Sequence, residues 1–147
     1  MPEPDERLYF LLQRAAHQLR LAADRRCLAA AGITTAQLGA LFAVHDHPGI
    51  TQQQLARTLG LRESAVTSLV TRLAAADLVT RRPHPNEHRA TALHLTDHGV
   101  AALDAARPEI DRFNAELRAR LGDTTFTQTA AALSKLTHDA SESTPGP

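Results

Sequence analysis

The sequence is poor in the residues on which several classes of protein depend. Its 147 residues include one cysteine, no tryptophan and 3% aromatic residues. A single cysteine excludes an intrachain disulfide and a zinc site built on cysteines. No apolar run approaches the roughly 18 to 20 residues that a membrane span needs, and the first residues lack the basic and apolar pattern of a leader peptide. We therefore expect a soluble protein of the cytoplasm with no membrane partner.

The composition favours one helical globular domain. Hydrophobic residues make up 43% and charged residues 22%, and abundant alanine with few aromatics is typical of packed helices. The length suits a single domain, residues 1–147. Formal net charge is zero, but residues 51–90 hold six arginines against three acidic residues, so this stretch carries +3 and the rest −3. A positively charged segment in an otherwise negatively charged chain favours contact with nucleic acid through that segment.

Apolar residues recur at intervals of three and four near both ends of the chain, which predicts long amphipathic helices. The first is expected over residues 5–31, with Gly32 ending it. Another begins at its cap, Thr96, and continues to Leu121 with an interruption and kink at Pro108. A last helix starts at Asp123 or Thr124.

The apolar stripes of these terminal helices are too wide to bury within one small lobe. Pairing with a second copy of the chain would bury them, so we expect a homodimer. The expected organisation is a set of dimerisation helices at 5–33 and 97–140, a lobe at 34–96 and a flexible tail at 141–147.

The middle of the chain predicts a helix-turn-helix unit. Residues 34–37 and 51–54 each have the capping-box pattern that opens a helix, and the second helix ends before Gly60. The next helix is expected from about Arg62 to Ala76. Two helices joined by so short a glycine turn form this unit.

Two segments after this helix, Leu78–Arg82 and Ala90–Leu95, alternate polar with apolar or small residues, as half-buried strands do. The polar loop 83–89 joins them. The pair predicts a β-hairpin of the kind called a wing. The expected fold class is therefore mainly α with a small β-hairpin wing, a winged helix-turn-helix.

The second helix of such a unit lies in the major groove of double-stranded DNA. Its outer face here offers hydroxyl and guanidinium groups that can contact bases or phosphates. The candidates are Arg62, Ser64, Thr67, Ser68, Thr71 and Arg72. The alternative is a solvated helix surface, which is less favoured once a wing follows.

The wing adds three candidate DNA contacts, Arg82, His88 and Arg89. An arginine at the end of the loop suits a narrow A·T-rich minor groove, and we expect Glu87 to brace Arg89. The alternative is a solvated hairpin turn. Loss of imidazole charge on His84 and His88 could also weaken DNA binding as pH rises, although loop histidines without that role are the favoured interpretation.

Six segments share their order and spacing with a known family. They are Leu55–Leu61, Ala65–Leu73, Asp77–Val79, Arg81–Pro83, Glu87–Ala90 and Leu95–Gly99. On these segments the chain resembles the MarR family, the multiple-antibiotic-resistance type regulators. The resemblance implies a dimer whose two winged lobes read a near-palindromic site and repress nearby genes. The sequence departs from the family at Glu87, where Asp is usual, and at His88, which is often Arg.

The resemblance also implies a phenolic or other small aromatic effector that releases the DNA. Arg14, His17, Arg20 and His45 are candidates for binding it, because Arg or His can meet an anionic ligand. The favoured alternative for each is exposed surface or a hydrogen bond between subunits. Cys27 is the candidate for redox sensing, but a buried inert thiol is the favoured interpretation.

Other classes of function find little support. The eight histidines show no recognised metal-ligand spacing, so no metal or other cofactor is expected. The chain has no glycine-rich phosphate loop and no nucleophile elbow, and we expect no enzymatic activity. The remaining alternatives are a winged helix that docks another protein and a cysteine-based redox regulator.

Overall fold

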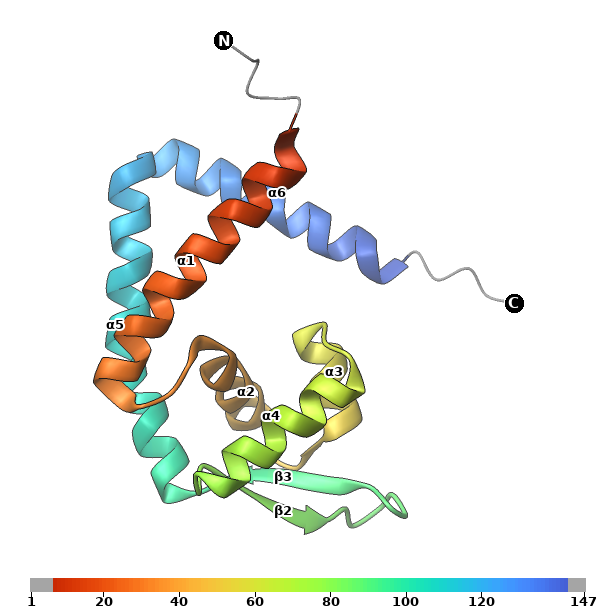
Figure 1. Ribbon diagram of the computed structural model, residues 1–147. Coiled ribbons are helices and arrows are strands. Elements are labelled where there is room, and N and C mark those ends of the chain that lie inside the picture. The colour runs from red at the N-terminus through yellow and green to blue at the C-terminus, as the bar shows by residue number, and fades with distance from the viewer. Residues whose placement is uncertain (1–6, 143–147) are drawn as a thin grey trace. The chain divides into compact units, whose positions relative to one another are not determined.

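The computed structural model describes residues 7–142, with side chains described as far as residue 137. The elements follow one another as α1 (Leu8–Ala31), α2 (Thr35–Asp46), β1 (Ile50–Thr51), α3 (Gln52–Leu59), α4 (Glu63–Ala75), β2 (Val79–Pro83), β3 (Thr91–Leu95), α5 (Asp97–Leu121) and α6 (Asp123–Glu142) (Figure 1). The expected helical start at Asp5 and most of the expected tail lie outside the described residues, while α6 extends two residues into that tail.

The chain divides into two compact units, residues 1–110 and 111–147. The first contains α1, the helix-turn-helix, the sheet and the first part of α5. The second contains the rest of α5 together with α6. The division between the two units falls inside α5.

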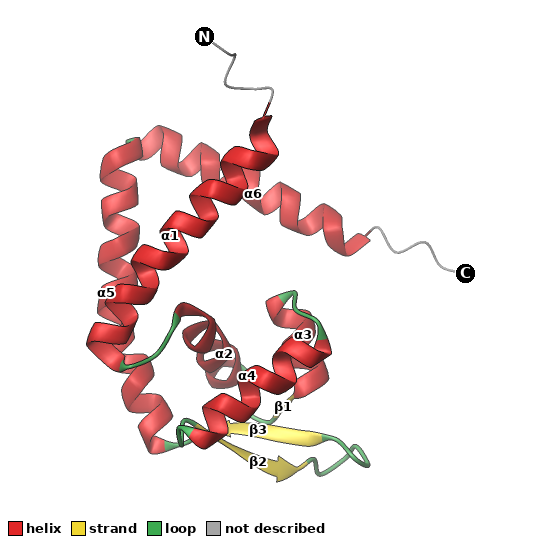
Figure 2. Ribbon diagram, in the orientation of Figure 1, coloured by secondary structure: helices red, strands yellow, loops and turns green. Residues whose placement is uncertain are grey.

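The expectation of a mainly helical chain with a small β-hairpin is confirmed (Figure 2). β2 and β3 pair antiparallel from Val79 opposite Leu95 to Pro83 opposite Thr91. The short strand β1 was not predicted, and it adds Ile50 opposite Leu93 on the other edge of β3. Two residues are too few to show the alternation by which strands are recognised.

Both predicted capping boxes are present. The Thr34 hydroxyl accepts from the Gln37 N–H, and the Gln37 side chain accepts from the Thr34 N–H; Thr51 and Gln54 repeat the arrangement at α3. Arg62 precedes α4 as its N-cap and makes no side-chain cap, so the helix begins one residue later than predicted.

The core of the first unit fixes the orientation of α4. Val66, Leu69, Val70 and Leu73 are all buried, as the periodicity predicts. They pack with buried residues of the other elements, among them Leu41, Leu55, Leu78, Leu93 and Leu103. Because one side of α4 is held in this way, its polar side faces solvent.

A compact junction connects α4, the wing and α5. The Thr96 hydroxyl donates to the Asp77 carbonyl at 2.5 Å and accepts from the Gly99 N–H at 2.9 Å, which confirms the predicted cap. Asp77 has a positive φ of 57°. Gly99 lies so close to the Leu78 carbonyl that a β-carbon at this position would overlap it.

An unpredicted contact joins α1 to α2. The Asp24 carboxylate of α1 accepts from both the N–H and the hydroxyl of Thr35, at 2.8 and 2.6 Å. These bonds lower the pKa of Asp24, the side-chain bond most strongly, against the opposing effect of partial burial. Asp24 thus supports the start of α2 from the neighbouring helix.

α5 runs to Leu121, as predicted, and continues through Pro108 without a break in the helix; the kink expected there stays a prediction. A proline removes a single backbone donor, and the bonds on either side sustain the helix here. In the second unit, the Arg118 guanidinium lies 4.4 Å from the Phe126 ring centroid and 3.6 Å from an Asp123 carboxylate oxygen. These contacts span the turn between α5 and α6.

No single helix among the described residues has the length and apolar composition of a membrane span. The pair α1 and α2 reaches that composition only when taken together, across a 67° bend.

Candidate nucleic-acid interface

The outer side of α4 presents the six predicted candidates to solvent. Arg62, Ser64, Thr67, Ser68, Thr71 and Arg72 are all exposed. The Thr67 hydroxyl donates to the Glu63 carbonyl at 2.9 Å, and the Thr71 hydroxyl donates to the Thr67 carbonyl at 2.8 Å. Because the hydroxyl hydrogens are used within the helix, these side chains face solvent as hydrogen-bond acceptors.

Arg81 belongs to this surface although the sequence reasoning did not select it. Its guanidinium, from β2, donates to the Thr71 hydroxyl oxygen of α4 at 3.0 Å. The alternation of side chains along β2 could have identified Arg81 from the sequence. Val79 is buried, so Arg81, two residues later, lies on the same side of the strand as the core helices. Arg81 therefore links the wing to the helix that precedes it.

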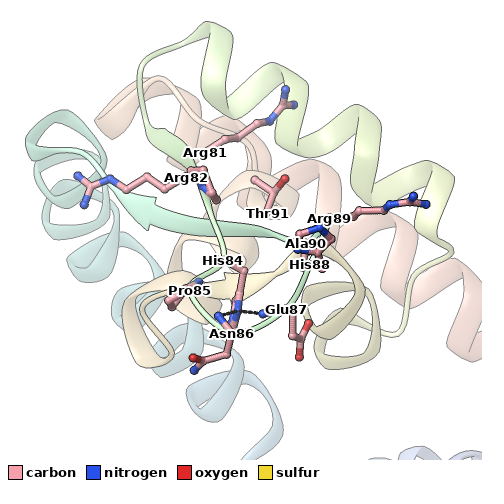
Figure 3. Close-up of a pocket in the computed structure, with 11 residues that line it drawn as sticks. Arg81, Arg82, His84, Pro85, Asn86, Glu87, His88, Arg89, Ala90 and Thr91 are labelled. Atoms are coloured by element: carbon pink, nitrogen blue, oxygen red, sulfur yellow. Dashed lines mark hydrogen bonds between the residues drawn. The ribbon is translucent and has the colours of Figure 1, made fainter.

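The wing loop is closed by backbone and side-chain bonds. The His84 N–H donates to the Ala90 carbonyl at 3.0 Å, and the Ala90 N–H donates to the Glu87 carbonyl at 3.3 Å. Nδ1 of the His84 ring accepts from the N–H groups of Asn86 and Glu87 (Figure 3). Arg89 has a positive φ of 69° within this loop.

The predicted brace between Glu87 and Arg89 is not formed. The two side chains point in different directions (Figure 3), and no ion pair joins them in the described part of the chain. The wing is held by the His84 ring instead. Arg82, His88 and Arg89 are exposed, as expected for side chains that meet a partner.

A groove of about 480 Å³ lies between α4 and the wing. It brings together the predicted candidates Thr67, His88 and Arg89 with Glu87. The start of α3 contributes Gln52 and Gln53, and the first turn of α4 contributes Glu63; none of these three was predicted. The other predicted α4 residues are exposed without lining this groove.

These unpredicted residues add polar chemistry to the groove. The Gln amides both donate and accept, and a carboxylate such as that of Glu63 can accept from the exposed amino group of cytosine. Acidic residues are common in the first turn of a helix, so the sequence offers no reason to select Glu63 as a DNA-contact residue. Its position in the groove of the folded chain identifies it.

All four effector candidates are exposed, and two of them lie close together. Nδ1 of His17 lies 3.4 Å from the Arg20 guanidinium on α1, and Arg14 is exposed on the same helix. His45, in the last turn of α2, lies 3.2 Å from Asp46.

Cys27 is buried and shows no sign of activation. Its thiol is fully inaccessible to solvent. Burial raises the pKa of the thiol, and the nearby negative charges of Asp24 and Glu109 raise it further. Both effects disfavour the reactive thiolate, and they argue against Cys27 as a redox sensor.

Across the described residues, no group of three or more His, Cys, Asp or Glu side chains is close enough to hold a metal ion. The groove between α4 and the wing brings together three of the nine predicted DNA-contact candidates, Thr67, His88 and Arg89, from two separate elements.

Comparison with known proteins agrees with this arrangement. The sequence profile of the MarR family matches residues 31–90. The chain is 31% identical over 97 residues to the HTH-type transcriptional repressor NicR of Pseudomonas putida, covering 66% of this chain and 61% of that protein. It spans 55 to 61% of the length of NicR and two further curated relatives.

Two solved structures extend the likeness to nearly the whole chain. The transcriptional repressor CouR, bound to a 23-mer DNA duplex, has a TM-score of 0.81 and 30% identity, covering 95% of this chain and 96% of CouR. The transcriptional regulator MosR of M. tuberculosis has a TM-score of 0.79 and 26% identity, covering 93% and 97%. With this identity over almost all of CouR and the profile match to the helix-turn-helix, the chain belongs to the MarR family.

Proposed function

We propose that this protein is a transcriptional regulator that binds double-stranded DNA through α4 and the wing. The observation that carries the proposal is the groove they share, where the polar side of α4 and the Arg89 side of the wing face the same space. α4 would enter the major groove and the wing the adjacent minor groove, with the DNA backbone passing between them. The surplus of three positive charges in residues 51–90 supports contact of this segment with the DNA phosphates.

The proposed contacts divide by kind. On α4, Arg62 and Arg72 would meet phosphates or guanine edges, and Ser64, Thr67, Ser68 and Thr71 would read bases or position the helix. On the wing, Arg82 and His88 would meet the backbone and Arg89 the minor groove. The α4 positions offered outward carry no large apolar side chain, which favours DNA over a protein partner.

We further propose that the protein acts as a homodimer and that residues 1–147 form one functional domain. α1 exposes Leu8, Tyr9, Phe10 and Leu11, and α6 exposes Leu133 and Leu136. So many exposed large apolar side chains on terminal helices favour burial against a second copy. A twofold dimer would present two α4 helices about one turn of DNA, roughly 34 Å, apart and would read a near-palindromic site.

Repression is the proposed outcome of binding, because NicR and CouR are both named repressors. Release by a small aromatic effector is proposed on the family resemblance, with Arg14, His17, Arg20 and His45 as candidate contacts. Measuring DNA release by simple phenolic acids in the wild type and in the Arg14→Ala and Arg20→Ala variants tests this part separately.

The test of the main proposal is a DNA-binding titration. Purified protein is titrated into a labelled duplex of the intergenic region upstream of its own gene, over a range of salt concentrations and against unrelated competitor DNA. Tight binding that resists competitor and weakens steeply with salt is expected. Equally weak binding to both duplexes would contradict sequence-specific recognition of that region.

A matched pair of variants locates the interface in the same assay. Arg72→Ala removes an exposed cation from α4, while Arg25→Ala removes an exposed cation from α1. We expect the first to weaken binding about tenfold and the second to leave it nearly unchanged. Equal effects would contradict the assignment of α4.

A further inference from the structure

One histidine of the wing makes two contacts with the backbone of its own loop. Nδ1 of His84 accepts from the Asn86 N–H at 3.1 Å and from the Glu87 N–H at 3.0 Å (Figure 3). His84 is half-buried, whereas Pro85 and Asn86 beside it are exposed. The ring therefore occupies the inner side of the loop and satisfies two backbone donors there.

These contacts constrain the chemical form of the ring. A neutral imidazole has one nitrogen that donates and one that accepts, and the cation has two donors. The two bonds to Nδ1 require a ring whose hydrogen is on Nε2, because Nδ1 can accept from the two N–H groups only when it carries no hydrogen. Protonation at Nδ1 would place a hydrogen against two backbone hydrogens, and both bonds would be lost.

The turn that His84 closes leads directly to Arg89, the residue proposed to enter the minor groove. Beyond Glu87 the loop returns through two backbone bonds, one to the Glu87 carbonyl and one from the His84 N–H to Ala90. Arg89 lies within this return, at a positive φ of 69°. A residue other than glycine holds that conformation only when its surroundings enforce it.

We propose that the neutral imidazole of His84 is a positioning group for DNA binding, which closes the wing turn and thereby directs Arg89 towards the minor groove. The inference rests on the proposed function of the wing. It reverses, for His84, the pH effect expected from charge alone. Acidification would add a positive charge to the wing but would open the turn that aims its arginine.

Other charged or titratable groups lie around the same loop. The wing hollow is lined by Arg81, Arg82, Glu87, His88 and Arg89, and Glu63 of α4 lines the adjoining groove. Their contributions to pH dependence are common to the wild type and to any variant at position 84, so the comparison of variants isolates His84.

The DNA-binding experiment compares three proteins from about pH 5 to about pH 8, the interval in which imidazoles change charge. His84→Ala removes the acceptor, and we expect DNA binding about tenfold weaker near pH 8. His84→Asn keeps a side-chain oxygen able to accept from the same N–H groups, as Asx turns do, and should remain within about threefold of the wild type. His98→Ala, at an exposed position of α5, is the matched control and should bind as the wild type does.

The pH profile separates a positioning role from a merely structural one. The affinity ratio of His84→Asn to the wild type should rise as pH falls, because only the wild type loses its acceptor on protonation. A ratio that is constant with pH, or an affinity of His84→Ala equal to that of the wild type, would overturn the proposal.

A second measurement needs no DNA and keeps this inference distinct from the proposed function. Nitrogen-15 NMR of the full-length protein should show His84 as the Nε2–H tautomer, and amide exchange at Asn86 and Glu87 should accelerate in His84→Ala. If the wild type binds no DNA while these signals appear, the proposed function fails and the turn assignment stands. The Nδ1–H tautomer, or unchanged amide exchange in His84→Ala, would refute the turn assignment itself.

Discussion

At the scale of single residues, Arg89 carries the clearest functional prediction. Replacing it with Ala removes the guanidinium, and the backbone cost of the positive φ stays similar because both residues carry a β-carbon. We expect DNA affinity to fall about tenfold, since minor-groove arginines contribute through charge and shape. Arg89→Lys is the control: it keeps the charge and should retain part of the affinity. Unchanged affinity in Arg89→Ala would remove the wing from the interface.

Gly99 carries a structural prediction at the same scale. A β-carbon there would overlap the Leu78 carbonyl, so Gly99→Ala must displace the junction between α4, the wing and α5. We expect the free energy of unfolding to fall by about 1 to 3 kcal/mol or more in urea titrations. Gly39→Ala is the matched control, because a β-carbon there makes only an ordinary contact with Leu59. It should be neutral or stabilising by up to about 1 kcal/mol within its helix. Equal effects at the two sites would contradict the close approach at Gly99.

Much at this scale follows from local sequence. Thr34, Thr51 and Thr96 were all predicted as caps because a cap needs only neighbours within three residues. Asp24 and Arg81 were missed because their partners, Thr35 and Thr71, are 11 and 10 residues away. No local pattern signals contacts of that separation.

At the scale of elements, the bond between α1 and α2 predicts how stability depends on pH. The pKa of Asp24 lies below its ordinary value of about 3.8 in the folded protein. The ionised carboxylate therefore stabilises the fold above pH ~3.8, and this contribution is lost as pH falls through the lower, folded-state pKa.

Two variants separate the charge of Asp24 from its hydrogen bonds. Both bonds end on the same carboxylate oxygen, so Asp24→Asn can keep them while removing the charge. Asp24→Ala removes both and should cost about 1 kcal/mol at neutral pH, as loss of a helix cap does. In thermal unfolding from about pH 7 to about pH 3, the advantage of the wild type over Asp24→Asn should shrink on acidification. A constant advantage over that interval would contradict the linkage.

The wing shows how far element-scale prediction reached. Alternation gave both strands to within one residue at each end, because the period of two is a local property. The contact expected to hold the loop between the two strands was predicted wrongly. The Glu87 and Arg89 pair suggested an ion pair, but the turn places the two side chains apart and uses His84 instead.

At the scale of the whole molecule, the exposed apolar side chains of α1 predict self-association. Removal of residues 1–20 should yield a monomer or an insoluble chain, and light scattering after gel filtration measures this. Because truncation can disturb folding, a double variant, Leu8→Glu with Phe10→Glu, changes two side chains that are 58% and 62% exposed. We expect this variant to keep its helical content, to lose the dimer and to bind DNA more weakly.

The control for this prediction is Leu61→Glu, which changes an exposed leucine at the turn between α3 and α4. It should leave the oligomeric state unchanged. A double variant that remains dimeric, or a monomer that binds DNA as tightly as the wild type, would contradict the dimer proposal.

The sequence alone determined the order of the helices and of the two wing strands, the caps of the middle helices, the buried side of α4 and the resemblance to the MarR family. These depend on periodicity and on contacts between near neighbours, both visible along the chain. The tertiary structure decided the groove shared by Gln52, Glu63, Thr67 and Arg89, the link from Arg81 to Thr71, and the contact of Asp24 with Thr35. Those features join residues that only packing brings together, so their physical cause is the fold itself.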